Sequence, residues 1–157
     1  MNIMKKRFNY LVGAVVGLLM VMNSNKGQAQ AISYYPWNSI LSVATNPTKV
    51  LWGDFRVQTN SFTSSLNTET VLMLNVGYTR NTNIYVGGGI NLGLVAAALD
   101  NKPLLKGYSA SVGMRSYPFD KMPKVSVNFE LSPYVNSDGE SGLIRSWFGV
   151  GYHFGGK

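Results

Sequence analysis

The sequence predicts an all-β protein that forms an up-and-down antiparallel transmembrane β-barrel. Three observations lead to this fold class. Apolar and polar residues alternate along six segments of about twelve residues, a length that is long for an ordinary strand but suits a tilted crossing of a bilayer. Only 13% of the residues are charged, against about 25% in soluble domains. After the N-terminal region, no apolar run is long enough for a membrane-spanning helix.

The first 31 residues have the pattern of an export signal peptide. A basic cluster at 5–7 precedes an apolar stretch at 8–22, and Ala29-Gln30-Ala31 forms a small-x-small cleavage site. The mature chain is expected to begin at Ile32, or at Gln30 if cleavage follows Ala29. Most of the formal net charge of +7 leaves with this segment, and the remaining basic residues do not cluster along the chain. Nucleic-acid binding is therefore not expected.

The alternation defines six strands in chain order. They cover residues 50–62, 66–80, 83–95, 106–119, 124–135 and 143–154. In the fifth, Val125, Val127, Phe129 and Leu131 share one face, and Glu130 lies on the other.

Residues 39–44 offer a seventh, short strand. Bacterial single-chain barrels have an even number of strands, eight or more. Either a pair of strands escapes the pattern and the barrel has eight, or the sheet does not close alone. We divide the chain into the signal peptide 1–31, an N-terminal periplasmic segment 32–48 and a β-barrel domain 49–157.

The connections predict the orientation of the barrel. Those at 81–82 and 120–122 are tight, whereas those at 96–105 and 136–142 are longer and polar. Outer-membrane barrels place short turns in the periplasm and longer loops outside. Both termini are therefore expected to be periplasmic.

Five charged residues fall on the polar faces and form an expected interior network: Asp54, Arg56, Arg115, Glu130 and Arg145. One interpretation is an ion- or solute-selective lumen. The other, which we favour, is a set of salt bridges that fills the interior, because side chains just fit inside a small barrel and buried charges must be paired. Glu130 is expected to pair with one of the three arginines.

The sequence predicts no enzyme, no cofactor and no metal site. The chain has no Cys and a single His, His153, so neither a nucleophile–base pair nor a metal-ligand set is evident. The triplet Gly87–Gly89 lies within an alternating strand and lacks the context of a phosphate-binding loop.

The last strand contains Gly149, Tyr152 and Phe154 in a pattern that resembles the assembly signal of outer-membrane proteins. This resemblance implies recognition by the barrel-assembly machinery. The sequence departs from that signal in two ways. Three residues follow Phe154, which is usually terminal, and Trp147 lies where the signal usually has a polar residue. More widely, the stretches 35–39, 45–47, 52–62 and 65–69 look like small outer-membrane barrel proteins of Bacteroidota, a resemblance that implies fold and location but no reaction.

Together these patterns predict a small integral outer-membrane barrel with a structural or accessory role in the cell envelope, as a subunit of a larger envelope complex or alone. Its expected partners are outer-membrane lipid, the assembly machinery and other envelope proteins. The alternative is a soluble exported barrel, similar to a lipocalin, that binds a small apolar ligand. The two differ in which face of the sheet is apolar, since a lipocalin-like barrel is apolar inside.

Overall fold

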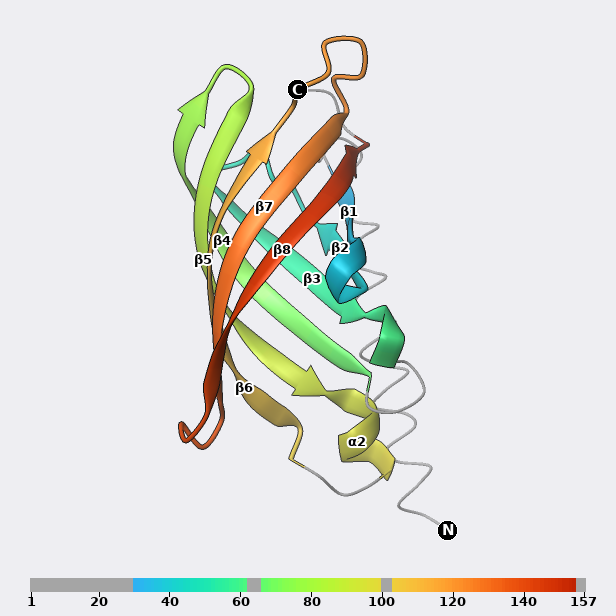
Figure 1. Ribbon diagram of the computed structural model, residues 1–157, viewed down its shortest axis with the longest axis vertical. Helices are drawn as coiled ribbons and strands as arrows, with labels where there is room; N and C mark the ends of the chain where they lie inside the picture. The colour runs from blue at the N-terminus through green and yellow to red at the C-terminus, as the bar shows by residue number, and fades with distance from the viewer. Residues whose placement is uncertain (1–29, 62–65, 100–102, 155–157) are drawn as a thin grey trace.

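The computed structural model describes residues 30–61, 66–99 and 103–154, so nearly all of the predicted signal peptide lies outside it. Eight antiparallel strands close into a barrel in chain order (Figure 1). They are β1 (Ala31–Tyr35), β2 (Ile40–Ala44), β3 (Leu51–Gln58), β4 (Asn67–Thr79), β5 (Thr82–Gly93), β6 (Leu105–Ser116), β7 (Val125–Asn136) and β8 (Gly142–His153). The predicted fold, an all-β up-and-down barrel that has eight strands when closed, is confirmed.

The six strands expected from the alternation correspond to β3–β8, with their ends shifted by a few residues. Burial alternates along them as predicted. In β6, for example, Ser109, Ser111 and Arg115 are buried, whereas Val112 and Met114 between them are exposed. The polar residues therefore line the interior, and the apolar residues cover the outside.

The N-terminal strands close the barrel. β1 pairs with β2 along its whole length, and four of its residues, Ala31 to Tyr34, pair with β8. The segment 32–48, which the sequence analysis set apart from the barrel, thus supplies strand residues, and the barrel begins at Ala31 rather than at residue 49. The short 3-10 helix η1 (Pro36–Asn38) and Ser39, with a φ of 50°, make the tight turn between the two strands.

The barrel wall differs in height around its circumference. β4–β8 have 12 or 13 residues each, whereas β1 and β2 have five. In Figure 1 the blue strands accordingly occupy only part of the height of the molecule. Where β1 ends, η1 packs beside β8, and the rings of Trp37 and Phe148 lie 5.4 Å apart.

A small helix replaces part of one expected strand and loop. β5 ends at Gly93, and α2 (Leu94–Leu99) follows, with the alanine-rich sequence LVAAAL. Alanine and leucine favour helix over strand. A second 3-10 helix, η2 (Thr59–Ser61), follows β3. Within the described ranges, no helix is both long enough and apolar enough to cross a membrane.

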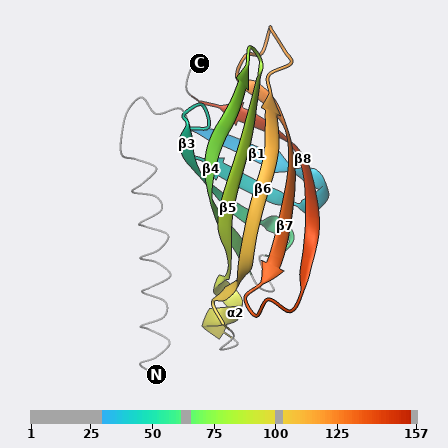
Figure 2. The same ribbon diagram turned by 90° about the vertical axis from the view of Figure 1, so that its left-hand side faces the viewer.

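The connections fall at two ends. The β2–β3, β4–β5 and β6–β7 turns share one end, and η1, η2, α2 and the β7–β8 turn lie toward the other. Figures 1 and 2 both show the β4–β5 and β6–β7 turns at the top and α2 at the bottom. The end with the three turns is called the turn end below.

Two glycines make room for interior tyrosines. A Cβ atom on Gly113 would lie 2.5 Å from the Tyr85 ring, and one on Gly149 would lie 2.6 Å from the Tyr35 ring. Large rings therefore fit inside this narrow barrel because the neighbouring strand has a glycine beside each ring. Val71 packs against Gly87 and Gly89, and Met73 packs against Gly87.

Candidate functional site

The interior of the barrel holds a network of charged side chains. Three arginines and three carboxylates lie inside: Asp54 and Arg56 on β3, Glu69 on β4, Arg115 on β6, Glu130 on β7 and Arg145 on β8. All five residues proposed for the network from the sequence are present in it. The formal charges of the six groups sum to zero, and two of the arginines form ion pairs with all three carboxylates.

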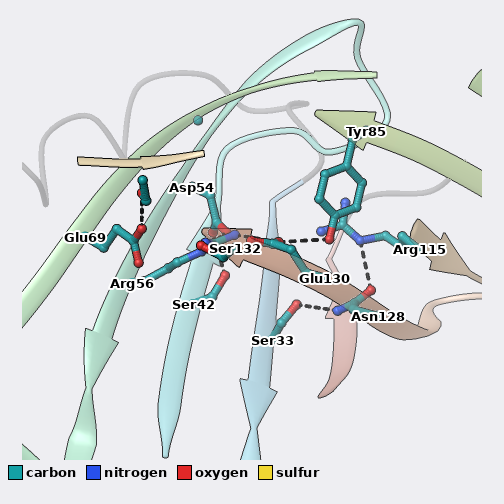
Figure 3. Close-up of polar contacts among 12 residues, drawn as sticks. Ser33, Ser42, Asp54, Arg56, Glu69, Tyr85, Arg115, Asn128, Glu130 and Ser132 are labelled. Carbon is teal, nitrogen blue, oxygen red and sulfur yellow. Dashed lines mark hydrogen bonds and ion pairs between the residues drawn. The ribbon is translucent and has the colours of Figure 1, made fainter. Parts of the chain in front are cut away.

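Arg56 is the centre of this network. Its Nε donates to Asp54 Oδ2 and its Nη2 to Glu130 Oε2, both at 2.8 Å. β3 and β7 are four strands apart in a barrel of eight. The Arg56–Glu130 pair therefore crosses the barrel between opposite walls, as the close-up in Figure 3 shows.

Further groups fix the two carboxylates. Ser42 donates to Asp54 at 2.5 Å, and the Tyr85 hydroxyl donates to Glu130 Oε2 at 3.1 Å. Glu130 has no solvent exposure, and Arg56 is 2% exposed. At this level the barrel is filled by side chains.

Arg115 has a different environment. Its Nε donates to Asn128 Oδ1 at 3.1 Å, and Asn128 in turn donates to Ser33. The guanidinium lies 4.8 Å from the Trp52 ring centre and 5.7 Å from that of Tyr85. Within the described residues no carboxylate lies within ion-pair distance of Arg115, so its charge is stabilised by an amide and two aromatic faces.

Arg145 forms the third ion pair, toward the end that holds α2. Its Nη2 contacts Glu69 Oε1 at 3.0 Å and Ser132 Oγ at 2.9 Å, and Ser109 donates to the same Glu69 oxygen. The guanidinium stacks 5.0 Å from the ring centres of Tyr134 and Trp147.

The sequence analysis missed Glu69 as an interior residue. Along β4, Glu69 lies on the same inward-facing side as the buried residues Met73 and Asn75. If the alternation is extended to the start of this strand, it also places the Glu69 carboxylate inside. The number of interior carboxylates then equals the number of interior arginines.

A serine and a histidine also meet inside the barrel, which the sequence did not indicate. Ser126 Oγ and His153 Nε2 lie 3.2 Å apart, and the Tyr117 hydroxyl is 3.3 Å from the same nitrogen. Burial raises the pKa of the Tyr117 phenol. Among the described residues no acid contacts His153 Nδ1. Ser126 is fully buried, so this pair lacks the substrate access and the orienting acid of a hydrolytic triad.

The residues proposed for the assembly signal divide between the two faces. Gly149 is buried against Tyr35, whereas Tyr152 and Phe154 are exposed on the outside with their rings 5.3 Å apart. No group of three or more potential metal ligands occurs in the described part of the chain. The interior thus combines ion pairs, aromatic stacking and hydrogen bonds that link strands distant in sequence.

Comparisons with protein-family models, with curated proteins and with solved structures find no significant match to this chain. They supply neither a family nor an activity, so the role of the barrel has to be argued from its two faces.

Proposed function

We propose that this protein is a small integral barrel of the outer membrane with a structural or accessory role in the cell envelope, as a subunit of a larger envelope complex or alone. The observation that carries the proposal is the chemistry of the outer face. In the eight described strands, the exposed positions that alternate with buried ones hold no charged residue. Lys106, at the register shift between β5 and β6, donates to Asn67. Water rarely meets so large an uncharged apolar surface on a soluble protein.

The outer face is apolar on every strand. Large apolar side chains that are at least one-third exposed occur on all eight, among them Tyr34, Leu41, Leu51, Leu72, Ile84, Val112, Phe129 and Val150. The belt that they form is continuous because neighbouring strands are paired around the whole barrel. Transfer of this apolar surface from water to lipid is favourable by about 25 cal/mol per Å² of surface.

The lengths of the strands also suit a bilayer. Twelve residues extend about 40 Å along a strand, and a tilt of about 40° reduces that to about 30 Å along the barrel axis. This height is close to that of the hydrocarbon core of a membrane. Five neighbouring strands, β4–β8, reach it.

The interior argues against the lipocalin-like alternative. An apolar ligand needs an apolar cavity, whereas this interior holds six charged groups and is occupied by Arg56, Glu130 and Trp147, all with little or no exposure.

The export signal belongs to this proposal, and the fold favours one of its two cleavage positions. Ala31 pairs with Ala44 on one side and with His153 on the other. In addition, the Gln30 carbonyl accepts from the Phe154 amide at 2.8 Å. Cleavage after Ala29 keeps these contacts, so the mature chain should begin at Gln30. A mature mass that starts at Ile32 would contradict this assignment.

Fractionation tests the proposed location. The protein should remain in the membrane pellet after carbonate extraction and in the sarkosyl-resistant fraction. Recovery as a soluble periplasmic protein would refute the proposal.

A pair of variants sharpens the test. Val112→Arg places a charge at mid-strand on the outer face, and Phe119→Arg places the same charge in the β6–β7 turn. An arginine on the lipid face costs about 2–4 kcal/mol at the midplane and about 0–1 kcal/mol near the interface. Membrane recovery should therefore fall for Val112→Arg and persist for Phe119→Arg. Equal recovery of both variants would mean that the outer face does not meet lipid.

A further inference from the structure

The turns at the turn end carry four exposed basic residues, here called the basic rim: Lys49, Arg80, Lys121 and Lys124. Lys49 belongs to the β2–β3 turn, Arg80 to the β4–β5 turn, and the two other lysines to the β6–β7 turn. The up-and-down topology brings these three turns to one end, although they are far apart in the sequence. Figure 2 shows the β4–β5 and β6–β7 turns together at the top of the barrel.

The charge of the basic rim is not neutralised within the described residues. Asp120 is the one acid in the same turns, which leaves the described part of the turn end at +3. None of the four cations forms an ion pair with a described residue. The β7–β8 turn at the opposite end carries two acids instead, Asp138 and Glu140. The barrel is therefore electrically asymmetric along its axis.

The residues around the basic rim are large and apolar. Tyr78, Phe119, Met122 and Phe154 are each 43–57% exposed at this end. They continue the apolar belt up to the cations, so positive charge begins where the apolar surface ends. Basic and aromatic side chains in this arrangement are typical of the headgroup level of a membrane.

We propose that the basic rim binds the phosphate groups of anionic glycerophospholipids in the leaflet that the turn end faces. This inference rests on the proposed membrane location and adds a lipid preference to it. Four exposed cations spread over three turns can contact several headgroups at once. Each Lys or Arg near an anionic surface contributes about 1 kcal/mol at low salt, which corresponds to about fivefold in affinity.

The test uses the refolded protein in phosphatidylcholine bilayers, with spin-labelled phosphatidylglycerol and spin-labelled phosphatidylcholine as probes. The measured quantity is the ratio of their association constants at the protein surface. For the wild type we expect phosphatidylglycerol to be preferred about fivefold at low salt, and less as salt screens the charges. In the variant K49Q/R80Q/K121Q/K124Q the ratio should fall to about one.

A matched variant controls for charge in general. D138N/E140Q changes two exposed residues at the opposite end and should keep the wild-type ratio. A wild-type ratio of one, or a ratio that the quadruple variant retains, would overturn the lipid assignment. A stronger preference for a bisphosphorylated glycolipid that the quadruple variant loses would also overturn the choice of a glycerophospholipid. Incorporation into pure phosphatidylcholine bilayers tests the membrane proposal separately, because it does not depend on lipid charge.

Discussion

Replacing Glu130 with alanine is expected to lower the free energy of unfolding by about 3 kcal/mol. Glu130 is fully buried and accepts from Arg56 at 2.8 Å and from Tyr85 at 3.1 Å. Removing one member of a buried ion pair costs about 3–5 kcal/mol. We expect the lower end of this range because Arg56 keeps its second carboxylate partner, Asp54.

Two milder variants separate the contribution of the Glu130 charge from that of the Tyr85 hydroxyl group. Glu130→Gln preserves the shape and an accepting oxygen but removes the charge, so it should cost less than alanine. Tyr85→Phe removes only the hydroxyl that donates to Glu130 and should cost about 1 kcal/mol. The expected order of destabilisation is alanine, then glutamine, then the Tyr85 variant.

Urea unfolding in the presence of liposomes measures these differences. Fluorescence of the three tryptophans reports the transition, since Trp147 and Trp52 are buried beside the interior arginines. With a slope of about 2 kcal/mol per M, the alanine variant should unfold about 1.5 M earlier than the wild type. If the alanine and glutamine variants both kept the wild-type midpoint, the interior ion pairs would not stabilise the barrel.

Two further predictions concern glycine packing and the last strand. Gly113→Ala should destabilise the barrel by about 1–3 kcal/mol, because its Cβ would lie 2.5 Å from an interior tyrosine ring, whereas Gly53→Ala, with its nearest contact at 3.8 Å, should be nearly neutral in the same urea assay. Similar losses for both would show that ring clash is not the cause. Phe154→Asp should give less folded protein than His153→Asp, read as heat-modifiable mobility on a gel, because Phe154 is 57% exposed on the apolar outside and His153 faces the polar interior. Equal yields would mean that the faces of this strand are assigned wrongly.

The long strands were predictable because their evidence is local. Strand residues alternate between two faces whatever lies next to them, so twelve residues of alternation suffice to define a strand and both of its faces. β2 (Ile40–Ala44) corresponds to the short seventh strand that the sequence offered at 39–44. β1 escaped because five residues hold only two or three alternations, and because it is held by β8 at the other end of the chain. The even strand number of bacterial barrels required one strand more than these seven but did not locate it.

The interior contacts were predictable in kind but not in detail. The alternation of side chains along each strand places Arg56, Arg115, Arg145 and Glu130 inside the barrel. Which arginine reaches Glu130 depends on how the strands are staggered in the closed barrel. Arg56 does so from the opposite wall. The pairing of Ser126 with His153 likewise depends on the register of β7 against β8, which no pattern within one strand contains.

The central claim is that the outer face of the barrel contacts lipid while its inner face is closed. A spin-label scan of β7 tests this most directly, because the chain has no Cys and each introduced Cys is therefore unique. Labels at the exposed positions of Phe129 and Leu131 should be accessible to oxygen, which dissolves in lipid, and protected from a water-soluble nickel chelate. A label at the buried Ser132 should be protected from both reagents. Accessibility of the Phe129 and Leu131 labels to the nickel chelate would place this face in water and contradict the account.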